Sequence, residues 1–259
     1  MRPLFMRRPD VSRAVLALAS SDLVPHHDVV PTARERVRAE LTAEITEAAR
    51  RQLAEVGAAA LSLRAVAREL GMASSALYRY FPSRDDLLTR LIIDGYDALG
   101  EAAEKADDPA ALPAERWLTV CRAVRTWASE HPHEYALLYG SPVPGYQAPK
   151  DTVPAATRVG VVLGRILGDA ARAGQLPETA GQRDASLISD EAVEVLGGDH
   201  PALDEDVRVR ALLAWSAIYG TISFELFGHF VGSVEDGDRY FDRAMTELAG
   251  LIGLRAVHR

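Results

Sequence analysis

Four hydroxyl-bearing side chains fall within seven residues of the sequence, at Ser74, Ser75, Tyr78 and Tyr80. Short polar side chains near the start of a helix allow its backbone to approach base edges in the major groove of DNA. Hydroxyl groups can also donate hydrogen bonds to phosphate oxygens. The spacing therefore indicates a surface suited to duplex DNA, provided that these residues lie on the outer face of a supported helix.

The residues interleaved with the hydroxyls predict that support. A helix over residues 73–80 would direct Ala76, Leu77 and Phe81 toward a partner helix. Pro82 then keeps Phe81 out of helical geometry. Ser83 is expected to cap a long helix that runs to about Lys105, with acidic residues in its first turn.

A further short helix is predicted directly before residue 73. Apolar residues recur there at spacings of three and four, which gives one buried stripe. Ser62 is expected to cap its start with the hydroxyl, and Gly71 to end it in a left-handed conformation. The stripe consists of Leu63, Val66, Ala67 and Leu70, and the charged residues Arg64, Arg68 and Glu69 lie off it.

An apolar helix, a glycine turn and a second helix also occur in many helical proteins that do not bind DNA. Here the pattern is longer than the turn, because five successive elements between Arg34 and Leu88 agree with one family. This stretch closely resembles the N-terminal domain of TetR-type transcriptional regulators. The matching residues are Ile45, Ala48, Ala49 and Leu53 with Glu55-Val56-Gly57, then Leu61 to Ala67, Gly71, Ala76 to Phe81, and Ser83 to Leu88.

The resemblance implies which side chains contact DNA. In such proteins the tyrosines and the arginine at the last corner lie mainly on phosphates, and Ser74 and Ser75 are then the candidate base readers. Ala76 offers only a methyl group, for instance to a thymine. The positions that match DNA-contacting residues are Arg64, Ser74, Ser75, Ala76, Tyr78, Tyr80 and Arg84.

The charge of the chain is unevenly distributed. The formal net charge is −8, yet residues 1–90 carry 14 Lys and Arg against 11 Asp and Glu, whereas residues 91–259 carry 15 against 26. This asymmetry is typical of a mildly basic DNA-binding region followed by an acidic body. Phosphate contacts should make the binding of DNA fall steeply with salt concentration.

Three regions are expected along the chain. Residues 1–31 precede the recognisable pattern and are interpreted as a mobile extension or an upstream start without function, although a basic arm that enters a minor groove is an alternative. Residues 32–88 form the helix-turn-helix domain and residues 89–259 a helical body for effector binding and dimerisation. No run approaches 18 apolar residues, so no membrane span is expected and the chain is predicted to be cytoplasmic.

The body is predicted to be all-α, so that the fold class of the whole chain is all-α. Helical periodicity covers residues 113–130, 154–174, 183–196, 204–230 and 236–254, with Pro and Gly between them. The segment from Trp127 to Gly140 also resembles, more weakly, the start of the C-terminal domain in one subgroup of TetR-type regulators.

Aromatic residues in this body are candidates for the wall of an effector pocket. The alternative is that they form the ordinary core, as aromatic residues at helical spacing commonly do. Cys121, which has no other cysteine to pair with, has the same alternative. The candidate effector-binding residues are Trp117, Cys121, Trp127, His131, Tyr135, Tyr139, Trp215 and Tyr219.

No enzymatic activity, metal site or cofactor is predicted. The sequence His131-Pro132-His133-Glu134 contains the one cluster of acid–base groups, and its proline opposes the helical spacing that zinc-binding histidines use. A glycine-rich phosphate loop and a serine-centred elbow are both missing from the sequence.

Two rows of apolar residues in the last two long helices predict a homodimer with a four-helix interface. Two DNA-reading heads would then contact half-sites of a palindromic operator about 34–36 Å apart or somewhat more. The resemblance implies a repressor released by a small apolar or aromatic effector; the alternative is a DNA-binding dimer without an effector. The rows are Leu212, Trp215, Ile218, Tyr219, Ile222 and Leu226, and Phe241, Met245, Leu248 and Ile252.

Overall fold

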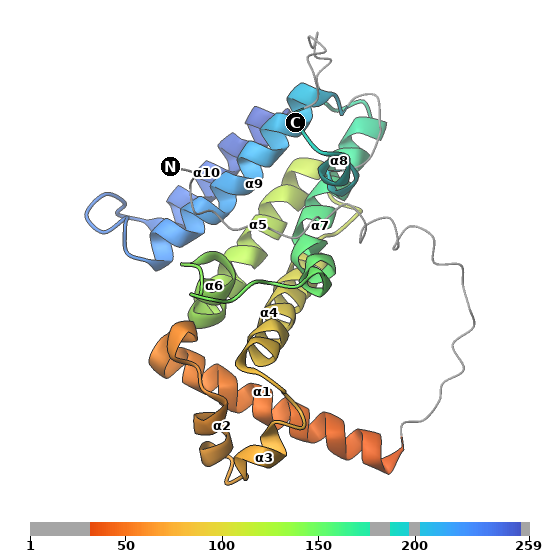
Figure 1. Cartoon of the computed structure of the whole chain (residues 1–259). Helices are drawn as coiled ribbons and strands as arrows, with labels where there is room; N and C mark the ends of the chain where they lie inside the picture. Colours follow the sequence, from red (N-terminus) through yellow and green to blue (C-terminus); the bar gives the residue numbers. More distant parts are fainter. Residues whose placement is uncertain (1–31, 177–186, 197–202, 255–259) are drawn as a thin grey trace, which may run out of the picture. The chain divides into compact units, whose positions relative to one another are not determined.

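A computed structural model describes residues 32–176, 187–196 and 203–254 of the chain (Figure 1). Within these ranges every regular element is a helix, which confirms the predicted all-α fold class. The extension predicted for residues 1–31 lies outside the described residues. The elements are α1 (Ala33–Ala60), α2 (Leu63–Glu69), α3 (Ser74–Leu77), α4 (Arg84–Ala106), α5 (Pro113–Glu130), α6 (Pro132–Tyr139), the 3-10 helix η2 (Lys150–Thr152), α7 (Val153–Arg172), α8 (Asp190–Val195), α9 (Glu205–Leu226) and α10 (Gly237–Ile252).

The chain divides into two compact units. Of the described residues, the first unit contains 32–95 and 133–153, and the second contains the described residues from 96 to 132 and from 154 onward. Helix α4 begins in the first unit and ends in the second. The functional boundaries predicted at residues 31 and 88 remain predictions.

The first unit has its core where α2 packs on α1 and α3. The buried stripe predicted for α2 is confirmed for Leu63, Val66 and Ala67. Leu77, the one large apolar residue of the short helix α3, is also fully buried in this core. Other buried apolar residues of the first unit are Ile45, Ala48, Ala49 and Leu53 on α1 and Leu87 and Leu88 on α4.

The predicted helix ends are partly confirmed. Gly71 has φ +64°, the left-handed conformation expected of it, and Ser83 Oγ accepts a hydrogen bond from the backbone N–H of Asp86. Ser62 precedes α2, but its hydroxyl accepts no capping hydrogen bond, so this part of the prediction is wrong. Helix α3 is also shorter than predicted, since regular α-helix ends at Leu77 and turns follow over residues 78–80.

The remainder of the first unit packs on the first part of α4. The hydroxyls of Thr89 and Tyr146 share a hydrogen bond of 2.9 Å. Gly95 lies so close to Leu138 that an added Cβ would stand 3.5 Å from its methyl carbons. The sequence did not predict α6 as a separate helix, although Pro132 fits its first turn because no intrahelical acceptor exists there for a backbone N–H.

The second unit is held together by α5, which packs on both α9 and α10. The indole N–H of Trp117 donates to the Met245 carbonyl oxygen at 3.1 Å, within the core. Arg125 on α5 forms ion pairs with Glu225 and Asp238. These contacts fix the relative position of the three helices.

A buried ion network joins the end of α4 to α5 and α7. The guanidinium of Arg116 donates to both carboxylate oxygens of Asp107, at 2.6 and 3.0 Å, and to Asp169 at 2.7 Å. Arg165 adds a second cation on Asp107. The side chains of Arg116 and Asp107 are only 2% and 0% exposed, so each charge depends on its partners.

The rows of apolar residues predicted to form a dimer interface lie largely inside the protomer. The prediction that they face a second protomer is therefore wrong. Six of the ten are buried, because α9 and α10 use this side to pack on each other and on α5. A different set of apolar residues on these helices is exposed. The buried six are Ile218, Tyr219, Ile222, Phe241, Met245 and Ile252.

The helices described in the structure include none that is long and apolar enough to cross a membrane.

Replacing Asp107 with alanine should lower the free energy of unfolding by about 3–5 kcal/mol, because Arg116 would retain a buried charge without its main partner. Urea unfolding followed by circular dichroism measures this loss. Glu247→Ala is the matched control, since it removes a carboxylate from an exposed pair with Arg243 and should change stability little. Equal effects of the two substitutions would contradict the buried network.

The contribution of Asp107 to the free energy of unfolding should also depend on pH. Burial raises the pKa of Asp107, but hydrogen bonds from Arg116 and Arg165 outweigh it and hold the pKa below its ordinary value. The ionised carboxylate therefore contributes stability that is present above about pH 4 and is lost as the pH falls through the lowered pKa. Asp107→Ala should lack this part of the acid dependence.

Candidate nucleic-acid interface

The outer surface of α3 presents the predicted hydroxyl-bearing residues. Ser74, Ser75 and Tyr78 are exposed, and Ala76 and Tyr80 are half-buried. No side-chain hydrogen bond to another described residue involves the hydroxyls of Ser74 or Ser75, which leaves both available to an outside partner. The structure thus brings five of the seven predicted DNA-contacting residues together on one short segment.

The orientation of this segment depends on the residues at either end. The turn before α3 is closed by the backbone N–H of Met72, which donates to the Ala67 carbonyl oxygen at 2.8 Å. At the other end, Leu77 and Phe81 are 0% and 6% exposed. Because both apolar side chains lie in the core, the serines just before Leu77 and Tyr78 just after it are left on the outer surface.

Arg64 on α2 is exposed and its DNA contact remains a prediction, whereas Arg84 is engaged within the protein. The Arg84 guanidinium donates to the carbonyl oxygens of Ala58, Ala59 and Leu61 at 2.7 to 3.1 Å. These carbonyls end α1 after the break at Gly57, which has φ 73° and ψ 166°. Arg84 therefore supplies hydrogen-bond donors to the free carbonyl groups at the end of α1, a role that the sequence did not indicate. Its contact with phosphate remains a prediction.

Sequence reasoning also missed exposed cations beside this surface. Arg79 is exposed between the two tyrosines. The guanidinium carbon of Arg38, on α1, lies 5.4 Å from the centre of the Tyr80 ring. The proximity of Arg38 to α3 could not be read from the sequence, because the two residues are brought together only by the packing of the head.

Two of the predicted effector-binding residues lie deep in the second unit. Trp117 and Cys121 are each 1% exposed, and Trp117 is hydrogen-bonded to α10. Burial raises the pKa of the Cys121 thiol far above its usual value, so the thiol stays protonated. Both side chains are part of the buried core, and their contact with an effector remains a prediction.

Trp127 differs from Trp117 in one respect. It is 6% exposed, and its buried indole N–H finds no acceptor among the described residues. The ring stacks on His131, with centroids 5.0 Å apart and an interplanar angle of 17°. An unsatisfied buried donor costs about 1–3 kcal/mol, so this group stands out from the rest of the core.

The other predicted effector-binding residues form separate pairs. The rings of Tyr135 and Tyr139 lie 5.0 Å apart on α6. Those of Trp215 and Tyr219 lie 5.2 Å apart on α9. Tyr135 and Tyr139 belong to the first unit, and the remaining candidates belong to the second.

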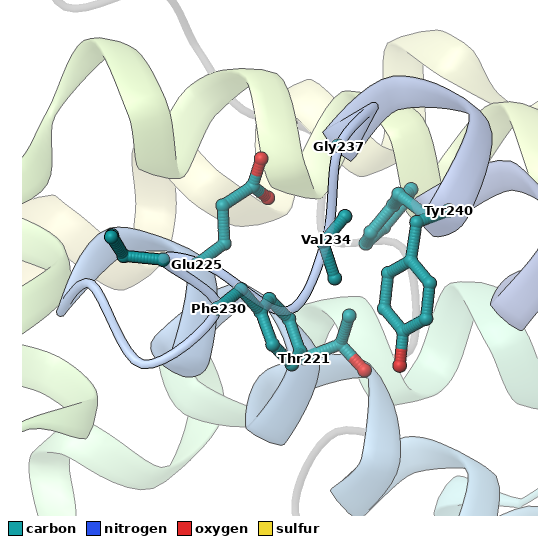
Figure 2. Close-up of a pocket in the computed structure, with 8 residues that line it drawn as sticks. Thr221, Glu225, Phe230, Val234, Gly237 and Tyr240 are labelled. Carbon is teal, nitrogen blue, oxygen red and sulfur yellow. The ribbon is translucent and has the colours of Figure 1, made fainter.

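A cavity of about 190 Å³ lies under the segment that joins α9 to α10 (Figure 2). The rings of Phe230 and Tyr240 meet edge to face at 5.2 Å beside it. No predicted effector-binding residue lines this cavity, whose polar lining residues are Thr221, Glu225 and Tyr240. The lining consists of Thr221, Glu225, Phe230, Val231, Val234, Gly237, Tyr240 and Phe241.

In the described part of the chain, no three His, Cys, Asp or Glu side chains are grouped to hold a metal ion.

Comparison with known proteins identifies the class of protein that this arrangement defines. Residues 45–91 match the family described as bacterial regulatory proteins of the tetR family, and residues 117–248 match the tetracyclin repressor-like C-terminal domain. The first match covers α2, α3 and most of α1. The second covers most of the helical body.

Individual relatives extend over nearly the whole chain. The HTH-type transcriptional regulators Rv1816 of Mycobacterium tuberculosis and Mb1846 of Mycobacterium bovis are each 41% identical over 239 residues, which is 87% of this chain and 96% of theirs. The solved structure of SCO4313 is 36% identical, with a TM-score of 0.66, and covers 85% of this chain and 100% of that one. A tetR-family protein from Rhodococcus RHA1 shares the fold at 19% identity and a TM-score of 0.57, covering 83% of this chain and 98% of its own.

The chain belongs to the TetR family of transcriptional regulators, and its N-terminal helices form the DNA-binding helix-turn-helix of that family. The family consists of regulators rather than enzymes. The roles of individual side chains at the DNA surface remain predictions.

Two substitutions on α3 test those roles. Tyr78→Phe should weaken binding to all duplexes by about 1 kcal/mol, or fivefold, because it removes one hydrogen bond to phosphate without changing the ring. Ser75→Ala should change the preference at one base position instead. Equilibrium binding to a panel of single-base variants measures both effects, and the opposite pattern would exchange the two roles.

Proposed function

We propose that this protein is a repressor that acts in the cytoplasm as a homodimer, occupies a palindromic operator, and leaves it when a small effector binds to the body. The observation that carries the DNA part is the pair of exposed serine hydroxyls on α3, which have no side-chain partner among the described residues and lie next to the buried Leu77. Selection of bound sequences from random duplexes tests this part directly. Recovery of an inverted repeat supports it, and failure to enrich any sequence contradicts it.

The dimer is supported by the composition of α9. Its inner side is buried by α5 and α10, yet its opposite side is also rich in apolar and small residues. Leu213 and Phe224 are 54% and 52% exposed there, with the exposed Ser216 and Gly220 between them. A helix that is apolar on both sides requires a second partner, and a second copy of the chain provides one through a two-fold axis.

Gly220→Arg should convert the dimer into a monomer. A Cβ at Gly220 meets nothing within 4 Å in the protomer, so the fold should tolerate the change, whereas a charged side chain in the centre of an apolar interface should not be tolerated. Sedimentation at micromolar concentration measures the result. Gly250→Arg is the matched control, because Gly250 on α10 is equally open and follows the exposed Thr246 and Glu247 by one turn. A dimeric Gly220→Arg protein would refute this interface.

The effector is proposed to bind beside Trp127 at the end of α5. The indole N–H there lacks an acceptor in the described part of the chain, and a ligand with a carbonyl, carboxylate or phenolic oxygen would supply one. The stacked Trp127 and His131 rings offer an aromatic surface for the same ligand. These features favour an aromatic compound with one hydrogen-bond acceptor.

Trp127→Phe and Trp117→Phe form a matched pair on α5. Both substitutions remove similar volume from the core, but only Trp117 loses a hydrogen bond to the protein. Trp117→Phe should therefore be more destabilising than Trp127→Phe by about 1 kcal/mol in urea unfolding. Equal destabilisation would mean that the Trp127 N–H is satisfied in solution.

The same variants locate the effector. A thermal-shift screen with benzoate, acetophenone and related monocyclic compounds should find stabilising ligands of the wild type whose affinity drops about tenfold in Trp127→Phe. An unchanged affinity would instead favour the cavity under the segment that joins α9 to α10.

Helix α4 is proposed to carry the signal, because it is one continuous helix from the head into the body. In the body, α4 is bound to α7, because Arg158 of α7 forms ion pairs with Asp97 and Glu104 of α4. An effector that shifts α7 would therefore move α4 and with it the spacing of the two heads. A coupling of about 1–3 kcal/mol is sufficient to relieve repression.

The second candidate is a DNA-binding dimer without an effector. It predicts that no compound in the screen changes either the melting temperature or the affinity for the selected operator. A ligand that lowers operator affinity would exclude it.

A further inference from the structure

The N-terminal part of α1 projects beyond the core of the head. Residues 32–40 are all exposed, and the first buried residue of the helix is Ile45. In Figure 1 the red end of α1 runs on past α3. At 1.5 Å per residue, residues 33–44 extend the helix by about 18 Å.

This projection has a defined helical start. The hydroxyl of Thr32 accepts from the backbone N–H of Glu35 at 3.2 Å, and the Glu35 carboxylate accepts from the Thr32 backbone N–H at 2.7 Å. Such a reciprocal cap satisfies two backbone donors that a helix end would otherwise leave open. The extension is therefore positioned as a rod and not as a fraying end.

Two of the three arginines on this extension share a face with the residues that pack on the head. Arg34 and Arg38 lie eleven and seven residues before Ile45, which at 3.6 residues per turn places them on its side of the helix. Arg36 falls on the opposite side, with Glu40 and Glu47. The contact between Arg38 and the Tyr80 ring confirms this direction.

The charges of these arginines are not neutralised in the described structure. Arg50 and Arg51, farther along α1, form ion pairs with Glu47, Asp94 and Glu69. No carboxylate in the described ranges lies within ion-pair distance of Arg34, Arg36 or Arg38. Arg38 therefore places an unpaired positive charge next to a tyrosine that is predicted to contact phosphate.

We propose that Arg34 and Arg38 form a second DNA-binding surface, which grips backbone phosphates flanking those contacted by α3. The positive charge complements a phosphate strand, and the surface is continuous with α3 through the contact between Arg38 and Tyr80. Arg38 also holds the Tyr80 ring in place by a cation–π contact. This inference rests on the proposed operator binding and extends its footprint outward along each half-site.

The test compares two arginines of equal charge on the same helix. With the full-length protein and a duplex recovered by random-sequence selection, Arg38→Ala should weaken binding five- to tenfold. The slope of log K against log salt should become shallower by about one, since one phosphate contact is lost. Arg36→Ala, which removes the same charge from the opposite side, should leave both quantities unchanged.

Two further variants and a shortened duplex test the same contacts independently. Arg34→Ala should reproduce the reduced salt slope without affecting the Tyr80 contact, and Arg38→Lys should restore the slope but only part of the affinity. Trimming the outer flank of the duplex should weaken the wild type to the level of Arg38→Ala. Thermal melting checks that each variant is folded.

Equal affinities of Arg36→Ala and Arg38→Ala would overturn the inference while leaving operator binding intact. Binding of the wild type to vesicles with anionic headgroups, lost in Arg38→Ala without any change in DNA affinity, would also overturn it, because the surface would then serve a membrane. A wild type that binds no duplex would instead refute the proposed function itself.

Discussion

The burial of Leu77 and Phe81 is the interaction on which the DNA-binding surface depends. Helix α3 has only four residues, and so short a helix is not stable by itself because nucleation costs more than its few hydrogen bonds return. The packing of these two side chains against the core keeps the segment helical. The same packing fixes the direction of the polar residues next to them, so the reading surface is a product of tertiary structure.

Several arginines of the body are held by two carboxylates each, whereas several exposed arginines of the head have no carboxylate partner among the described residues. In the body, Arg116, Arg125 and Arg158 are each bound to two carboxylates. These pairs lock helices together and neutralise charge. On the head, exposed arginines such as Arg38, Arg64 and Arg79 have no such partner among the described residues, which leaves their charge available for phosphates. A net negative chain can therefore still present a positive surface to DNA.

The body combines one tightly bonded core with two features that the core does not use. The unsatisfied indole N–H of Trp127 and the apolar outer side of α9 are both costly in an isolated protomer, since one buries a donor without an acceptor and the other exposes apolar surface to water. A ligand and a second protomer would relieve these costs. Both features follow from packing of the same three helices, α5, α9 and α10.

The sequence by itself determined the fold class, the positions of most helices and the family, because helical periodicity, caps and the succession of motifs are local properties. It correctly placed Ser74, Ser75 and Tyr78 on the outer face of the helix-turn-helix. It could not assign Arg84 to the carbonyls of α1, place Arg38 on Tyr80, or tell which side of α9 would be free. Those results depend on contacts between residues far apart in the chain, and a helix that is apolar on both sides gives no local signal of which side its own protomer will bury. Only the tertiary structure decided them.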